Sequence, residues 1–258
     1  LNVPVPQKDS DGQWMYPGDM EPYKGNSSIY HKACRANAEA MSDLGIVYAL
    51  SGDAKYAEYC KRLLLAYAAG YRKYGHPTRR GQPWTEQMYR SAIDGRLTGQ
   101  FLTDGGWLIQ AANGCDLVWD LPSWTDEERR AVREDLFEAI AYEFVSDATG
   151  SRSYLEATHN RSAICNAGVL MAGYATDSEK LINYGLYGKG GTKEEPVGGA
   201  LGKHFGPECI GPDGLWNEGA PGYQVMATCA LVDVAETLWH HGIDMYRFND
   251  CALKRLLD

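Results

Sequence analysis

Hydrophobic residues recur at three- and four-residue steps along most of the chain, which is the spacing of amphipathic helices. A first helix is predicted over residues 33–50 and a second over residues 54–71, with Ser51-Gly52-Asp53 breaking the pattern between them. Two helices joined by so short a turn form an antiparallel helical hairpin. The apolar positions of the first helix are Ala36, Ala40, Leu44, Val47 and Tyr48.

The same spacing predicts more helices after this hairpin. They are expected over residues 105–119, 125–145, 160–175, 177 onward and 223–240. Thr125-Asp126-Glu127-Glu128 forms a capping box at the start of the second of these. The stretches 75–103 and 187–202 are rich in glycine and predict irregular structure. No segment shows the alternation of apolar and polar residues that is typical of a strand.

These elements predict an all-α fold, an incomplete (α/α) toroid of antiparallel helix hairpins. An α-solenoid is the alternative, but the chain lacks the short repeat signatures of tetratricopeptide or HEAT proteins, which favours the toroid. A last helix, with Asn249 or Asp250 as its N-cap, ends after about two turns and is too short to be stable unsupported. We therefore interpret residues 1–258 as one toroid domain, truncated before the remainder of its fold.

Composition narrows the possible functions. The 258 residues are 44% hydrophobic, which suits a folded domain with a large core rather than a disordered chain. Asp and Glu exceed Lys and Arg by 34 to 25, giving a net charge of −9, so a nucleic-acid partner is not expected. No apolar run reaches the ~20 residues that span a bilayer, so a membrane partner is not expected either.

The cysteines and the first residue bear on metal binding and on processing. Seven cysteines occur without a CxxC or CxxH pair, which argues against a zinc or thioredoxin-like site and leaves disulfides open. The sequence begins at Leu1 and shows no signal peptide. We therefore expect a processed or excised chain.

Polar residues gather where a loop meets the helix predicted at residue 160. His159, Asn160 and Arg161 are consecutive there. Because a helix N-terminus exposes backbone N–H groups and the positive end of the helix dipole, this cluster suits a carboxylate ligand. An ordinary N-cap at Thr158 or Asn160, with His159 as a satisfied structural partner, explains the same residues equally well.

A run of turn-forming residues leads into the last long helix. Glycines and prolines between residues 211 and 222 deliver Tyr223 to the start of that helix, where a phenol can point into a cleft. A tyrosine has an ordinary pKa of about 10, so it needs cationic neighbours before it can act as a base. Core packing of Tyr223 is the simpler alternative. Asp213 and Glu218 in the same run could instead be the paired carboxylates of a glycosidase.

Arginine and aromatic residues alternate in the irregular stretch before residue 103. Guanidinium groups bind carboxylates and aromatic rings stack on sugars, so this stretch suits a sugar acid, with a solvated basic loop as the alternative. His204 and Glu218 are further candidate substrate contacts, although a lone histidine beside glycines is more often structural. The candidate binding residues of the stretch are Arg79, Arg80, Trp84, Tyr89, Arg96 and Gln100.

Three segments follow one another in the order of motifs from a known family. They are the hairpin 37–57, His159-Asn160-Arg161 followed by Cys165-Asn166-Ala167-Gly168, and Pro212-Asp213-Gly214 through Glu218-Gly219-Ala220-Pro221-Gly222-Tyr223. Over about residues 35 to 240 the chain thereby resembles the heparinase II/III-like and oligoalginate lyase family of polysaccharide lyases. The resemblance implies an incomplete α/α toroid followed by an antiparallel β-sheet domain, and cleavage of uronic-acid polysaccharides by β-elimination.

The resemblance also implies roles for individual residues. Tyr223 matches the catalytic tyrosine and His159 the catalytic histidine, while Asn160 or Arg161 supplies neutralisation of the substrate carboxylate. Two departures bear on these roles. Thr158 stands before the histidine where several relatives have Asn, and a glycine- and lysine-rich stretch lengthens the path to the tyrosine.

Elimination chemistry suits these residue types. The C5 proton of a uronate is poorly acidic until the adjacent carboxylate is neutralised, which preorganised donors can do. A base then removes that proton and an acid protonates the departing O4 oxygen. Tyr223 can be the acid, or both acid and base when proton and leaving group share one face, with His159 as the alternative base. No metal or other cofactor is required.

We therefore expect a polysaccharide lyase that acts on an anionic polysaccharide, with alginate as the first choice. A glycosaminoglycan such as heparan or chondroitin sulfate is the alternative polymer. Two other classes stay open: a toroidal glycoside hydrolase using Asp213 and Glu218, and a non-catalytic carbohydrate-binding scaffold. An external polymer favours a secreted or periplasmic protein. The sequence indicates neither an oligomeric state nor endolytic or exolytic action.

Overall fold

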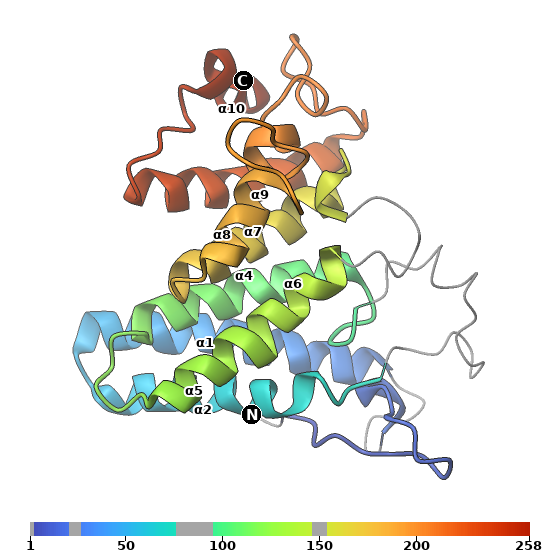
Figure 1. Cartoon of the computed structure of the whole chain (residues 1–258), viewed down its shortest axis with the longest axis vertical. Helices are drawn as coiled ribbons and strands as arrows, with labels where there is room; N and C mark the ends of the chain where they lie inside the picture. Colours follow the sequence, from blue (N-terminus) through green and yellow to red (C-terminus); the bar gives the residue numbers. More distant parts are fainter. Residues whose placement is uncertain (1–2, 21–26, 76–94, 146–153) are drawn as a thin grey trace. The chain divides into compact units, whose positions relative to one another are not determined.

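A computed structural model of the chain, shown in Figure 1, describes residues 3–20, 27–75, 95–145 and 154–258. Within these residues the regular structure is helical, and extended pairing is limited to two isolated bridges. The prediction of an all-α fold is therefore confirmed for this part of the chain. None of the described helices has the length and hydropathy of a membrane span. The chain divides into two compact units, residues 1–151 and 152–258.

The first unit is a set of packed helices, coloured blue to green in Figure 1. Its elements are η1 Pro17–Asp19, α1 Ser27–Ser51, α2 Ala54–Tyr71, α4 Phe101–Val118, α5 Asp126–Arg130, η3 Ala131–Phe137 and α6 Glu138–Val145. α1 and α2 form the predicted hairpin, with Asp53 capping α2 by accepting a hydrogen bond from Lys55 N–H at 3.1 Å. α2 has its predicted bounds, whereas α1 and α4 begin earlier than predicted.

The helix predicted from residue 125 to 145 is a continuous helical run with a π-helical segment, η3, in its middle. Its capping box is confirmed. Glu128 N–H donates to the Thr125 hydroxyl at 3.2 Å, and Thr125 N–H donates to the Glu128 carboxylate at 2.9 Å. The π-helical segment is a feature that a 3.6-residue hydrophobic period does not predict.

A glycine lets α1 and α4 pack closely. A Cβ on Gly114 of α4 would lie 2.4 Å from the Met41 carbonyl oxygen of α1, so no larger residue fits there. In the same unit the ring centroids of Tyr67 and Trp107 are 4.8 Å apart, and Asn37 Nδ2 donates to the Tyr67 hydroxyl at 2.8 Å. The core of the first unit thus combines close helix contact with a satisfied polar pair.

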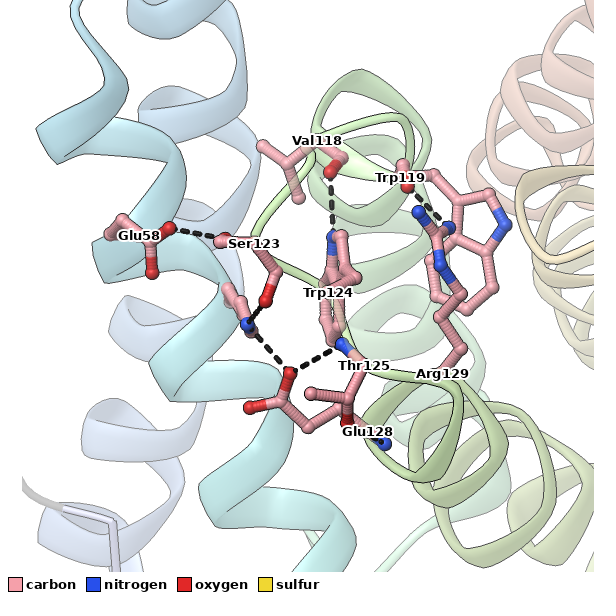
Figure 2. A network of polar contacts seen from close by, with 9 residues as sticks. Glu58, Val118, Trp119, Ser123, Trp124, Thr125, Glu128 and Arg129 are labelled. Carbon is pink, nitrogen blue, oxygen red and sulfur yellow. Dashed lines mark hydrogen bonds and ion pairs between the residues drawn. The ribbon is translucent and has the colours of Figure 1, made fainter.

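A buried lysine ties α2 to the turn before α5. Lys61 is 6% exposed, and its ammonium donates to the Ser123 carbonyl at 2.6 Å and pairs with Glu128 at 2.7 Å. It also lies 5.0 Å from the centroid of the Trp124 ring. Figure 2 shows that the Glu128 carboxylate faces Thr125 at the same time, so one side chain serves both the lysine and the cap. Because an unpaired buried charge is costly, this network fixes the turn against α2.

The second unit, coloured yellow to red in Figure 1, is built around a second helical hairpin. Its elements are η5 Tyr154–Glu156, α7 Asn160–Ala175, α8 Glu179–Tyr187, η6 Ala200–His204, α9 Pro221–His240 and α10 Phe248–Leu257. α7 has its predicted bounds and packs against both α8 and α9. A Cβ on Gly173 would lie 2.7 Å from the Ile182 nitrogen, so glycine is needed where α7 meets α8.

The last helix begins differently from the prediction. Asn249 and Asp250 are predicted as N-caps, and together with Cys251 they form a left-handed kink inside α10, with φ of 47°, 54° and 55°. The regular turns of the helix follow Cys251, and the Asn249 amide donates to the Phe205 carbonyl at 2.9 Å. Asn and Asp are among the few residue types that visit this conformation.

A buried carboxyl group organises the segment that leads into α4. Asp104 is 1% exposed and accepts hydrogen bonds from Leu97 N–H at 3.2 Å, from Thr98 N–H at 2.8 Å and from the Thr98 hydroxyl. Gly95 makes room for it, since a Cβ there would lie 2.0 Å from Asp104 Oδ2. Burial raises the pKa of Asp104 to about 7, although the three hydrogen bonds act in the opposite direction.

This carboxyl group predicts a pH-dependent stability. Because the folded state holds the Asp104 proton more tightly than the unfolded chain does, its contribution is complete below about pH 4 and is lost as the pH rises toward 7. Asp104→Asn cannot ionise, so we expect it to remove this fall in the free energy of unfolding, which is on the order of a few kcal/mol. Urea denaturation at a series of pH values measures how steeply the free energy of unfolding falls with pH. Asp120→Asn, at an exposed position, is the control. An unchanged slope in Asp104→Asn would contradict the assignment.

Candidate functional site

His159 caps the N-terminus of α7 through its ring. Its Nδ1 atom accepts a hydrogen bond from Ser162 N–H at 3.0 Å, and its backbone is extended, as an N-cap residue requires. A ring nitrogen that accepts from an amide carries no proton, so the neutral imidazole of His159 holds its proton on Nε2. His159 therefore presents an N–H donor whose tautomer is fixed by the helix itself.

The surroundings of His159 favour the uncharged imidazole. Burial lowers its pKa, and the nearby Arg161 guanidinium lowers it further, while the backbone and Glu218 act more weakly in the opposite direction. At neutral pH the Nε2–H donor is therefore neutral, and the positive charge of this helix end belongs to Arg161.

Tyr154 belongs to the same cluster, although the sequence pattern does not single it out. Its ring centroid lies 5.0 Å from that of His159. Burial raises the pKa of its hydroxyl, and Arg161 beside it has the opposite effect. The ring of Tyr154 thus packs against His159 while its hydroxyl lies close to the guanidinium. Its place in the same polar segment, a few residues before His159, is the signal that could have identified it.

A carboxylate from a distant segment holds this helix end. Glu218 Oε2 accepts hydrogen bonds from the backbone N–H of Asn160 at 2.5 Å and from the Trp216 indole N–H at 2.9 Å. A negative charge at the first turn of a helix also complements the helix dipole. Glu218 therefore fastens the turn that contains Trp216 to the N-terminus of α7.

Asn217 strengthens the same junction. Its side-chain amide donates to the Thr158 carbonyl at 2.5 Å and to the Glu208 carbonyl at 3.0 Å. The backbone on both sides of His159 is consequently held by neighbouring residues of one turn, Thr158 by Asn217 and Asn160 by Glu218. Neither Trp216 nor Asn217 is predicted from the sequence, because their roles depend on this tertiary contact.

Tyr223 lies in the first turn of α9, as predicted, and is 47% exposed, which excludes the alternative of core packing. Two contacts fasten this helix end to the rest of the site. Gln224 Oε1 accepts from Trp216 N–H at 3.2 Å, and Met226 Sδ lies 3.6 Å from Asn160 Nδ2. Tyr223 precedes Met226 by three residues, so both lie on one side of α9. Tyr223 therefore lies one turn before the residue of α9 that contacts the N-terminus of α7, with its side chain exposed.

Two candidate substrate contacts are buried in the structure. Asn160 is 2% exposed and directs its amide toward Met226, so it does not offer that amide to a carboxylate. His204 is 0% exposed and lies with Nε2 2.8 Å from the Ser162 hydroxyl. Their burial argues against the substrate contacts predicted for Asn160 and His204, and Arg161 is the charged member of this cluster.

The candidates of the arginine-rich stretch belong to the first unit. Arg96 is engaged there, since its guanidinium pairs with Glu143 at 2.9 Å and also donates to the Tyr74 carbonyl. This ion pair competes with the role predicted for Arg96 as a ligand of a substrate carboxylate. Gln100 is exposed and occupies the N-cap position of α4. The residues that lie outside the described part of the chain are Arg79, Arg80, Trp84 and Tyr89.

The two carboxylates of the hydrolase alternative have local structural partners. Asp213 Oδ1 accepts from Leu215 N–H at 3.2 Å, and Glu218 Oε2 is occupied by two N–H groups. Between them Gly214 has a φ of 77°, and a Cβ there would lie 2.0 Å from the Arg255 carbonyl oxygen. The Asp-Gly pair is thus explained by a tight turn packed against α10, without an acid–base role.

Possible metal ligands and cysteines can be located in the described residues. No cluster of three or more His, Cys, Asp or Glu side chains suitable for a metal ion occurs among them. All seven cysteines are free, and most of them are buried. The groups that this part of the chain offers are the His159 hydrogen-bond donor, the positive charge of Arg161 and the exposed phenol of Tyr223 at the start of α9.

We expect Glu218→Gln to lower the free energy of unfolding by about 1 kcal/mol, because the amide keeps an acceptor oxygen but loses the charge that complements α7. Urea denaturation at neutral pH measures the change. Glu194→Gln, a charge-matched substitution in the exposed part of the glycine-rich stretch, is the control and should leave stability unchanged. Equal effects of the two substitutions would show that the Glu218 contacts do not hold the junction.

Comparisons with known proteins agree with the resemblance that the motifs carry. A sequence model of the alginate lyase family matches residues 4–258. An alginate lyase of Stenotrophomonas maltophilia is 29% identical over 239 residues, which cover 92% of this chain. An exo-oligoalginate lyase of Saccharophagus degradans is 29% identical over 218 residues, 84% of this chain. The chain spans 27% of the length of either relative. With the family model matched over nearly its whole length, the chain belongs to the alginate lyase family.

Proposed function

We propose that the protein containing this chain is a polysaccharide lyase that cleaves a uronic-acid polysaccharide by β-elimination. Alginate is the polymer that we propose first. The observation that carries the proposal is the fixed Nε2–H donor of His159 beside the Arg161 guanidinium, with the exposed phenol of Tyr223 on the adjoining helix end. The names of the two relatives support alginate as the polymer. The predicted toroid domain over residues 1–258 and an exported location, secreted or periplasmic, are parts of the same proposal.

His159 and Arg161 neutralise the uronate carboxylate in this mechanism. A carboxylate next to C5 must accept hydrogen bonds before the C5 proton becomes acidic enough to leave, because the intermediate concentrates negative charge on its oxygens. Arg161 supplies full charge and His159 a directed neutral donor. His159 is poorly suited to be the base, because Nδ1 is occupied by Ser162 N–H and Nε2 carries the proton.

Tyr223 then carries the proton in the elimination. As the base, the phenol oxygen takes the C5 proton after losing its own, the C5–H electron pair forms the C4–C5 double bond, and the C4–O4 bond breaks. The protonated phenol returns a proton to the O4 oxygen of the leaving chain, which requires the C5 proton and O4 to lie on one face of the sugar. The exposed position of Tyr223 at a helix start gives the phenol access to a polymer.

Removal of the phenol hydroxyl tests the proposal. We expect Tyr223→Phe to lower kcat/KM by about a hundredfold or more, because general acid–base catalysis contributes on that scale. Ultraviolet absorbance of the unsaturated uronate follows the reaction on alginate, heparan sulfate, chondroitin sulfate and glucuronan. Tyr142→Phe, an exposed tyrosine of the first unit, is the control.

The panel also separates the competing functions. Absorbance on heparan or chondroitin sulfate alone would name a glycosaminoglycan instead of alginate. New reducing ends without absorbance would contradict the lyase and favour hydrolysis by Asp213 and Glu218. Carbohydrate binding without either product would favour a non-catalytic scaffold.

A second substitution separates a donor from a base at His159. His159→Gln keeps an N–H donor but cannot take up a proton, whereas His159→Ala removes both capacities. If His159 neutralises the carboxylate, Gln should retain at least about tenfold more kcat than Ala, since one hydrogen bond to a developing charge is worth that much or more. Initial rates at saturating polymer measure the difference. Equal, complete loss in both variants would instead indicate that His159 is the base.

A further inference from the structure

The buried histidine His204 has no place in this elimination. It lies at the end of η6, is 0% exposed, and contacts the first turn of α7 through the Ser162 hydroxyl, 2.8 Å from its Nε2 atom. Buried polar groups are usually retained where they make hydrogen bonds that the fold uses. The contact between His204 and Ser162 therefore has a structural consequence at the start of α7.

Ser162 stands between two imidazoles and contacts both. Its backbone N–H donates to Nδ1 of His159 at 3.0 Å, and its hydroxyl bonds His204 on the other side. Ser162 is itself 0% exposed, so it has no solvent to replace either partner. A shift of Ser162 would therefore move the amide that determines which nitrogen of His159 carries the proton.

His204 is suited to hold Ser162 because it stays uncharged. Burial lowers its pKa to about 4, with a smaller contribution in the same direction from His159, and the Ala157 backbone beside it acts in the opposite sense. A neutral imidazole keeps one nitrogen free to accept a hydrogen bond at neutral pH. The ring thus bonds Ser162 through Nε2, while the Ala157 backbone lies near it without a hydrogen bond to Nδ1.

We propose that Ser162 and His204 are positioning residues that hold the first turn of α7, so that Ser162 N–H stays on Nδ1 of His159 and Nε2–H stays directed at the substrate carboxylate. The inference rests on the proposed function for its catalytic consequence. The placement of the His159 proton, in contrast, follows from these contacts alone.

Three substitutions in the intact protein test this. Ser162→Ala removes the hydroxyl and leaves the backbone N–H, Ser162→Thr restores a hydroxyl, and His204→Phe keeps a ring without its nitrogens. Ser178→Ala is the matched control, because this buried serine caps the neighbouring helix α8 without touching His159. Ser178→Ala should lower the free energy of unfolding and leave the tautomer of the His159 ring unchanged.

The first readout is the nitrogen NMR spectrum of the His159 ring. Its signals are assigned as those that disappear in the His159→Gln variant. We expect one Nε2–H tautomer in the parent protein and in Ser162→Thr, and averaged ring signals in Ser162→Ala and His204→Phe. The second readout is kinetic. Ser162→Ala should lower kcat about tenfold and change KM less than about twofold, because misplacement of a catalytic group acts mainly on the reacting geometry.

The outcomes separate this inference from the proposed function. An unchanged tautomer and kcat in Ser162→Ala would overturn the positioning role while the lyase stands. A parent protein inactive on every polymer would overturn the lyase, and the ring spectra would still decide the positioning role. If His204→Phe does not fold, the comparison of Ser162→Ala with Ser162→Thr carries the test. If Ser178→Ala lost as much kcat as Ser162→Ala, the loss would be a result of general destabilisation, and the proposal would be contradicted.

Discussion

The carboxylate of Glu218 connects the parts of the second unit from which the candidate site is made. It accepts one N–H from the backbone at the start of α7 and another from the indole of Trp216, which lies in the turn before α9. Asn217 joins the same turn to the Thr158 carbonyl, and α7 also packs against α9. The Glu218 carboxylate adds to this packing a charged acceptor that two segments distant in sequence share.

The parts of the fold that depend on local rules could be predicted from the sequence. α2 and α7 have their predicted bounds, because the apolar period and the residues that end it are all within the segment. The capping box at Thr125 forms as predicted, since both of its partners lie in one turn. The positions of His159 and Tyr223 at helix starts follow from the same kind of signal.

The parts of the structure that depend on tertiary contact could not be predicted from the sequence. Asn160 looks available beside His159, yet its side chain is buried against Met226 of another helix. The sequence predicts that Arg96 binds a substrate carboxylate, but in the structure its guanidinium pairs with the carboxylate of Glu143. Asn249 belongs to a residue type typical of N-caps, yet its amide donates to the Phe205 carbonyl of a distant segment and its backbone is left-handed. In each case a partner from another element decides the outcome, and local patterns do not identify that partner.

The central claim is that His159 donates to a uronate carboxylate while Tyr223 serves the reacting bond. A crystal structure of the intact Tyr223→Phe protein with a bound uronate oligosaccharide tests it most directly, because the slowed variant preserves the substrate. The account predicts a carboxylate within hydrogen-bond distance of His159 Nε2 and close to Arg161, with the aromatic ring at position 223 facing C5 and O4 of one sugar. An oligosaccharide whose carboxylate lies away from His159, or whose glycosidic oxygen lies out of reach of position 223, would contradict it.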